Sequence, residues 1–143
     1  MENKIKHLEM IQDVIKRMAS NSFALKGWAV TIVAALFALS AKESNDLFFL
    51  VAFIPVLMFW FLDSYYLKQE RLYRSLYDDV RKPQSTTDFS MAAKYEKYPE
   101  KRNRFWNCFK SPTELWFYFP LALVCGVVIL LKHCIIVSAA SAG

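Results

Sequence analysis

The sequence has few of the residues that build enzyme active sites or metal centres. It has two histidines and three cysteines, and Cys108, Cys125 and Cys134 show neither CxxC nor any other metal-ligand spacing. It contains no Walker loop, GxSxG, HExxH or dinucleotide-binding fingerprint. His7 and His133 fall at opposite ends of the predicted topology and cannot share a site within one chain. We therefore expect no enzymatic activity, no catalytic or metal-ligating residue, no cofactor and no disulfide framework.

Glycine is also scarce, at 3 of 143 residues, whereas 55% of the residues are hydrophobic and 16% are aromatic. The apolar residues gather in three blocks, and the mean hydropathy is positive, as is typical of membrane proteins. The length allows one domain, with room for a few membrane helices and a small soluble cap. We expect an all-α membrane protein with an N-terminal amphipathic helix and three transmembrane helices, the second of which extends into a cytoplasmic helix.

Residues 1–22 have the pattern of a cytoplasmic amphipathic helix. Leu8, Ile11 and Ile15 recur at intervals of three or four, and charged residues fill the other positions. Such a helix either lies on the membrane surface or packs against another helix in an oligomer. Its charges are mixed in sign, and no Trp or Phe precedes Phe23, which favours packing.

The next block, residues 23–67, reads as a transmembrane hairpin with spans at about 23–41 and 47–67. Lys26 lies near the start of the first span, free to extend towards the headgroups. Pro55 lies inside the second span and should bend it, either as simple packing or as a gating hinge. Lys42 to Asp46 form the polar turn between the spans.

Small residues mark one side of the first span. Such residues let another helix pack closely; the other interpretation is that Thr31 meets water in a pore, and the two roles can coexist. The residues are Gly27, Thr31 and Ala35 at four-residue intervals, with Ala34 and Ala38 close by.

The second span continues without a helix breaker into the cytoplasmic segment 68–110. Asp63 falls where hydrocarbon gives way to headgroups, and an ionisable residue there is costly unless it faces protein or water. Glu70 and Arg74, four residues apart, suit a solvated helix with internal ion pairs. In an oligomer they would instead pair between subunits or line a vestibule that favours cations. The pore or gate candidates are therefore Thr31, Asp63, Glu70 and Arg74.

The rest of the segment 68–110 contains a loop after Pro83 and a short helix expected over residues 89–95, with Asp88 or Thr87 as its N-cap. Basic and aromatic side chains mix over residues 94–110. One interpretation is a nucleic-acid surface, with phosphates on Lys and Arg and bases stacked on aromatic rings. The other, which we favour, is a membrane interface where basic side chains meet anionic lipid and Trp106 enters the headgroups.

A third transmembrane helix is predicted over residues 111–132. Ser111 suits the N-cap, Pro112 the first helical position and Glu114 the reciprocal position of a capping box. A re-entrant or interfacial helix is the alternative. Residues 133–143 are expected to form a short external tail.

The distribution of basic residues predicts the orientation. Nearly all Lys and Arg lie before residue 27 or within residues 68–110. The positive-inside rule therefore places the N-terminus and the middle segment in the cytoplasm and the C-terminus in the periplasm or outside the cell.

One stretch, FWFLDSYYLKQERLYRSLYDDV, with the preceding IKHLEMIQDVIKRMASNSFALKGWAVTIVAALFAL, resembles a known group of proteins. The group comprises small multi-span membrane effectors of bacterial anti-phage defence, of the SLATT type, and within it the channel proteins of Hailong systems. The resemblance covers roughly residues 4–82, and the third span is more loosely similar. The elements that carry it are Leu62-Asp63, Tyr66-Leu67, Glu70-Arg71 and Leu76-Tyr77-Asp78.

The resemblance implies a homo-oligomer, a tetramer by likeness to the group, that forms an ion channel in the bacterial inner membrane. A partner nucleotidyltransferase would make the controlling signal, a single-stranded DNA oligonucleotide or another nucleotide. In Hailong systems this signal is a DNA oligomer that holds the channel closed until infection. Opening would depolarise the membrane and stop growth. Basic residues suited to an anionic ligand or an acidic partner surface are Arg71, Lys94, Lys97, Lys101, Arg102 and Arg104.

Two other classes of function fit the same spans. A non-channel membrane anchor or scaffold would tether a cytoplasmic enzyme and conduct no ions. A holin-like protein would disrupt the bilayer through assemblies without a defined stoichiometry.

Overall fold

Three long helices dominate the structure. The computed structural model describes residues 2–40, 51–84 and 88–141, and over these residues the chain consists of helices and connecting loops. The predicted all-α class is thereby confirmed. The elements are α1 (Glu2–Ser40), α3 (Phe53–Arg81), the 3-10 helix η1 (Lys101–Asn103), α4 (Phe105–Phe109) and α5 (Pro112–Ser141).

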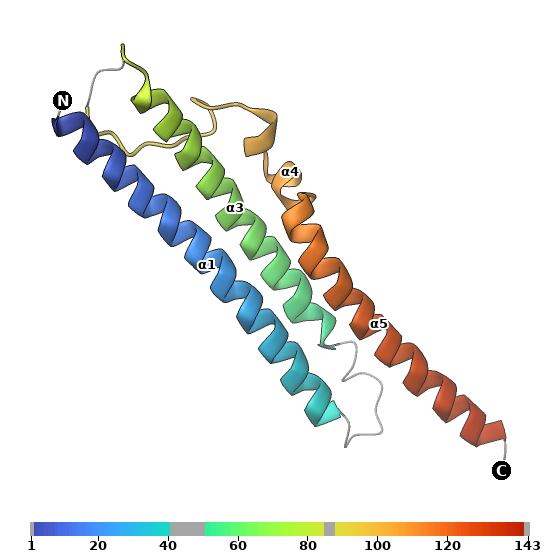
Figure 1. Ribbon diagram of the computed structural model, residues 1–143. Helices are drawn as coiled ribbons and strands as arrows, with labels where there is room; N and C mark the ends of the chain where they lie inside the picture. Colours follow the sequence, from blue (N-terminus) through green and yellow to red (C-terminus); the bar gives the residue numbers. More distant parts are fainter. Residues whose placement is uncertain (1, 41–50, 85–87, 142–143) are drawn as a thin grey trace.

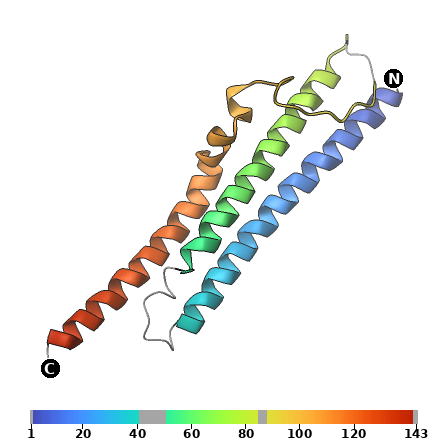
Figure 2. The same ribbon diagram turned by 180° about the vertical axis from the view of Figure 1, so that it is seen from behind.

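The long helices form an elongated bundle. α1 and α3 lie side by side in opposite directions, and α5 follows the first part of α3 in the direction of α1 (Figure 1). Seen from behind, residues 88–110 leave the N-terminal end of α1, cross α3 and reach α5 through η1 and α4 (Figure 2). One end of the bundle therefore contains α1, α3 and this crossing segment, and the other contains the three long helices.

α1 is one continuous helix of 39 residues. At 1.5 Å per residue it is about 58 Å long, roughly twice the hydrocarbon thickness of a bilayer. The sequence predicted an amphipathic helix over residues 1–22 and a first span from about residue 23, and the structure joins both in this one helix. The composition changes near Phe23, but no helix breaker accompanies the change. The amphipathic half packs on α3 of the same chain, with Ile11 against Leu72 and Leu76.

Two of the described helices, α1 and α5, are long and apolar enough to cross a membrane. Most of their apolar side chains are not buried within the chain: Phe23 is 81% exposed and Trp116 is 83% exposed. α3 carries no charged residue from Phe53 to Leu62. The predicted turn at 42–46 and the first residues of the predicted second span lie outside the described residues.

Two apolar clusters hold the bundle together, one in each half. The first joins α1, α3 and the crossing segment, and its buried members are Ile11, Leu72, Leu76, Val80 and Tyr98. The second joins α1, α3 and α5, and its buried members are Ala29, Val33, Val56, Tyr118 and Cys125.

The crossing segment is extended where a short helix over 89–95 was predicted. Phe89 has φ of 53°, which an α-helix cannot accommodate. The side chains of Met91, Ala93 and Tyr95 all pack on the first apolar cluster. That interval of two residues places every second side chain on one face, as extended backbone does. His7, buried on α1, anchors the segment because its Nε2 donates a hydrogen bond to the Ser90 carbonyl oxygen (3.1 Å).

α5 begins where the sequence predicted but ends later. It starts at Pro112, continues through Pro120 and passes residues 132 and 133 to end at Ser141. The expected non-helical tail is therefore wrong over residues 133–141, where neither Pro nor Gly interrupts the helix.

Candidate functional site

Charged residues stop at one level on all three long helices. On α1 none follows Lys26, on α3 none precedes Asp63, and on α5 none separates Glu114 from Lys132. Lys26, Asp63 and Glu114 lie together, because Lys26 Nζ contacts a carboxylate oxygen of each of the other two. We call these three residues with Tyr118 the boundary cluster. It ties the helices together where their uncharged part begins.

Lys26 is the centre of the boundary cluster. Its Nζ donates hydrogen bonds to Asp63 Oδ2, to Glu114 Oε1 (3.3 Å) and to Ser22 Oγ (3.1 Å). These bonds use all three N–H donors of the ammonium group. The Lys26 side chain is 17% exposed, whereas Asp63 and Glu114 are fully buried.

The carboxylates outnumber the cations in this cluster. Two acidic side chains share one ammonium group, and Tyr118 Oη donates a further hydrogen bond to Asp63 Oδ2 (3.0 Å). Among the described residues, the other oxygens, Asp63 Oδ1 and Glu114 Oε2, are buried and have no hydrogen-bond partner. Both carboxylates therefore depend on Lys26 for charge compensation.

An aromatic stack supports the boundary cluster. The Trp60 ring stacks on Tyr118 (centroids 5.8 Å apart) and on Phe109 (4.4 Å). Trp60 Nε1 also donates a hydrogen bond to the Phe109 carbonyl oxygen (3.1 Å). The stack fixes α4 and α5 against α3 one turn from Asp63.

Two members of the boundary cluster have roles other than those predicted. Lys26 points inward to its carboxylate partners, not outward towards headgroups. Glu114 completes no capping box: the Ser111 hydroxyl is buried without a hydrogen-bond partner, and the Ser111 carbonyl oxygen accepts the Glu114 N–H (3.1 Å). Glu114, like Asp63, is an acidic residue next to an apolar block in the sequence. This feature could have identified Glu114 as a candidate site residue.

The four pore or gate candidates do not lie on one face of the chain. Thr31 is exposed, and its Oγ1 donates a hydrogen bond to the Gly27 carbonyl oxygen (2.9 Å). Asp63 is enclosed in the boundary cluster. Glu70 and Arg74 form the predicted ion pair (2.7 Å) farther along α3. A single chain therefore offers Thr31, but not Asp63, to a neighbouring molecule or to water.

Some of the predicted basic residues form contacts within the chain, whereas others are exposed and free to bind a ligand. Arg71 holds the crossing segment, because it donates to the Arg102 carbonyl oxygen (2.8 Å) and to Cys108 Sγ (3.6 Å). Arg102 pairs with Glu100 at 2.6 Å. The remaining exposed candidates without an ion pair among the described residues are Lys94, Lys101 and Arg104.

Sequence reasoning missed a buried amide that fastens the crossing segment. Asn103 is fully buried, and its Nδ2 donates to Ser75 Oγ (3.1 Å) and to the Tyr98 carbonyl oxygen (3.0 Å). The sequence offers no signal for this contact, since residues 75 and 103 meet only in the folded chain.

A basic cleft of about 460 Å³ lies between α1, α3 and the crossing segment. Lys16, Arg74 and Arg102 bring three positive charges to it, and Asp78 brings one negative charge. The Tyr77 ring forms part of the wall. Of the basic residues predicted to suit an anionic ligand, the cleft contains Arg102, whereas Arg74 was a pore or gate candidate. Each of the three cations also forms an ion pair with an acidic side chain.

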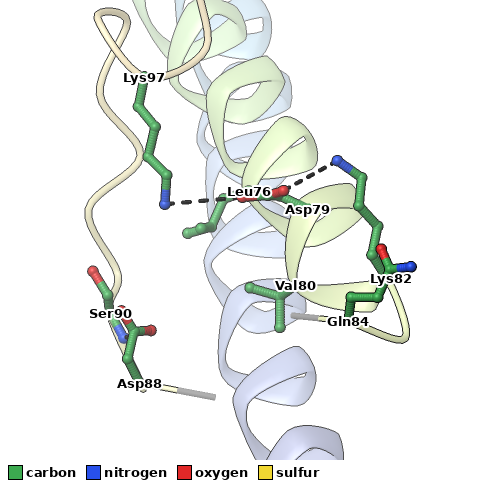
Figure 3. A pocket seen from close by; sticks show the side chains of 8 residues that line it. All are labelled: Leu76, Asp79, Val80, Lys82, Gln84, Asp88, Ser90 and Lys97. Carbon is green, nitrogen blue, oxygen red and sulfur yellow. Dashed lines mark hydrogen bonds and ion pairs between the residues drawn. The ribbon is translucent and has the colours of Figure 1, made fainter. Parts of the chain in front are cut away.

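A second cavity, of about 360 Å³, lies at the end of α3. Lys82 and Lys97 both extend towards Asp79, and Asp88 lies on the crossing segment below them (Figure 3). Its two lysines and two aspartates give it no net charge, so it does not select for an anion.

Asp79 should make the half of the bundle that contains the first apolar cluster sensitive to acid. The hydrogen bond from Lys82 Nζ (3.1 Å) chiefly holds the pKa of Asp79 below its usual value of 3.8. A carboxylate with a lowered pKa stabilises the fold above that range, and the contribution is lost as the pH falls below it. We expect Asp79→Asn to reduce the difference between unfolding free energies at pH 6 and pH 3 by less than about 1 kcal/mol, because the pair is solvated. Glu96→Gln, an exposed control, should leave the difference unchanged.

Comparison with protein-family models, curated protein sequences and solved structures finds no match for this chain. The candidate sites are therefore interpreted from their own chemistry.

Proposed function

We propose that this chain is the subunit of a homo-oligomeric ion channel in the bacterial inner membrane, with α1, α3 and α5 crossing the bilayer. Three helices cannot enclose an aqueous path alone, so a pore requires several copies. The level at which charges stop on all three helices supports this placement. The basic half of the bundle would lie in the cytoplasm and the C-terminus in the periplasm or outside the cell.

The observation that carries the proposal is the exposed small-residue face of α1. Its opposite face, with Ala29 and Val33, is buried in the second apolar cluster. A Cβ added at Gly27 would meet no atom within 4 Å. Helices associate in lipid through such small side chains because their backbones can approach closely. The exposed residues of this face are Gly27, Thr31, Ala34, Ala35 and Ala38.

The continuous helices supply a route for gating. α1 and α3 each pass the level of the boundary cluster without interruption. A change in packing in the cytoplasmic half therefore moves helices that also form the membrane half. The basic cleft with Lys16, Arg74 and Arg102 is where an anionic signal would act.

The biological role follows the resemblance. The channel would serve as an anti-phage effector that is controlled by a partner nucleotidyltransferase through an oligonucleotide or other nucleotide. Its opening would depolarise the membrane and arrest growth.

Ion flux from liposomes containing the purified protein tests the channel. The wild type should release a trapped ion, and the partner enzyme with its product should alter the rate. Gly27→Leu should abolish flux and the defined oligomer while leaving the helical content unchanged, because the new side chain projects from an exposed face.

Gly126→Leu on α5 is the matched control, since a Cβ there also meets no atom within 4 Å. It should retain flux. Loss of flux in this control but not in Gly27→Leu would assign the interface to α5 instead. A folded, inserted wild type without flux would exclude the channel and leave a membrane scaffold.

A further inference from the structure

Exposed tryptophans surround the boundary cluster. Trp28 follows Lys26 by two residues and is 61% exposed, and Trp116 follows Glu114 by two residues and is 83% exposed. Trp106 on α4 is 58% exposed. Indole rings prefer the headgroup level of a bilayer, where one side is apolar and the other is hydrated. The rings therefore mark the same boundary as the buried charges.

α4 lies beside this boundary because two of its residues, Phe105 and Phe109, pack on α3. The Phe105 ring lies 4.7 Å from Phe61, and the Phe109 ring lies 4.4 Å from Trp60. Both partners on α3 belong to the last turn before Asp63. Trp106, with its ring exposed between these two anchors, is held at the level of the headgroups.

The residues around Trp106 carry uncompensated positive charge. Lys101, Arg104 and Lys110 are exposed and form no ion pair among the described residues. Other nearby cations are paired with an acidic side chain. Lys97, for example, forms an ion pair in which its Nζ lies 3.9 Å from Asp79 Oδ2. An exposed aromatic ring flanked by unpaired cations matches the layered chemistry of an anionic membrane surface, with phosphates outside and acyl chains inside.

We propose that the exposed side of residues 101–110 binds the headgroups of anionic phospholipids on the cytoplasmic leaflet. Lys101, Arg104 and Lys110 contact lipid phosphates while Trp106 inserts between the headgroups. The lipid-bound part of the crossing segment would thereby be connected to α3 through Arg71 and Asn103. The inference rests on the membrane placement in the proposed function, but not on conductance.

Fluorescence quenching by brominated lipids tests this contact. The full chain is reconstituted in vesicles of phosphatidylcholine and phosphatidylglycerol, with either lipid brominated in separate samples. The Trp106 signal is the difference between the wild type and Trp106→Phe. Brominated phosphatidylglycerol should quench it more strongly, with a local enrichment of about fivefold for each bound cation.

Charge-neutralised variants give the decisive comparison. Lys101→Gln/Arg104→Gln/Lys110→Gln should lose the preference for phosphatidylglycerol. The control, Lys6→Gln/Arg17→Gln/Arg81→Gln, removes as many exposed cations farther from the boundary and should keep it. Equal quenching by the two lipids in the wild type, or no quenching of Trp106, would overturn the proposal. Displacement of the lipid by short single-stranded DNA would also overturn it and assign the surface to nucleic acid.

Different experimental results would contradict the proposed channel and the proposed lipid-binding surface. A preference for phosphatidylglycerol without ion flux would reject the channel and keep the lipid surface. Ion flux without that preference would do the reverse. Quenching of Trp28 and Trp116 reports insertion itself, because these residues lie on the membrane helices.

Discussion

Lys26→Met should lower the free energy of unfolding by about 3–5 kcal/mol, because it leaves two buried carboxylates without their shared cation. Methionine keeps most of the side-chain length, so the change removes charge and hydrogen bonds more than volume. Asp63 would retain the hydrogen bond from Tyr118, whereas Glu114 would lose its hydrogen bond from Lys26. Equilibrium unfolding in mixed micelles, followed by circular dichroism, measures the loss.

A compensating variant separates charge imbalance from packing. Lys26→Met/Asp63→Asn/Glu114→Gln removes all three charges, and it should recover much of the lost stability. Lys110→Met, at an exposed site without an ion pair among the described residues, should change stability by less than about 0.5 kcal/mol. If Lys26→Met is as stable as the wild type, the boundary cluster does not hold the helices together.

The sequence identified one member of the boundary cluster and missed its partners. Asp63 attracts notice because an acid beside an apolar block has no local explanation. Lys26 and Glu114 each have one, since a lysine at the start of a span can extend to headgroups and a glutamate after Ser-Pro-Thr can cap a helix. Each of these explanations accounts for one segment alone, and neither predicts that the three segments meet in the folded chain. The pairing is therefore a property of tertiary packing that single-segment reasoning does not reach.

Helix continuity was predicted for α3 and missed for α1 for related reasons. In α3 the charge pattern of residues 68–81 keeps helical spacing and no helix breaker lies between Leu67 and Pro83, so its extension beyond Leu67 was predicted correctly. In α1 the change in composition near Phe23 was interpreted as the end of the amphipathic helix. Composition reports the surroundings of a helix, whereas Pro, Gly and capping residues report where it ends. A helix can therefore change surroundings along its length without ending.

The sequence of the crossing segment contains a pattern that predicts extended backbone, but the expected N-cap led to the prediction of a helix. Asp88 and Thr87 look like N-caps, and that feature predicted a helix over 89–95. The apolar residues Met91, Ala93 and Tyr95 instead alternate with exposed ones, which is the period of extended backbone. Asp88 Oδ1 accepts the Ser90 N–H (3.0 Å), a local turn that starts no helix. Periodicity here was more informative than the cap.

Leu76→Ala should destabilise the half of the bundle that contains the first apolar cluster by about 2–5 kcal/mol, the usual range for a buried leucine truncated to alanine. Leu76 is 2% exposed and lies in the first apolar cluster, where α1, α3 and the crossing segment meet. The loss should fall mainly on the crossing segment, whose apolar side chains pack on this cluster. Trypsin cleavage after Lys94 and Lys97 should accelerate, because local opening precedes proteolysis.

Ile5→Ala is the matched control, since Ile5 is also an apolar helix residue of this half of the bundle but is 53% exposed. It should change the free energy of unfolding by less than about 0.5 kcal/mol and leave the cleavage rate unchanged. Unchanged cleavage in Leu76→Ala would mean that the crossing segment is held by Asn103 and Arg71 rather than by the apolar cluster. Because α3 runs unbroken from Leu76 to the boundary cluster, an increase in ion flux in the same variant would connect packing around Leu76 to the opening of the proposed channel.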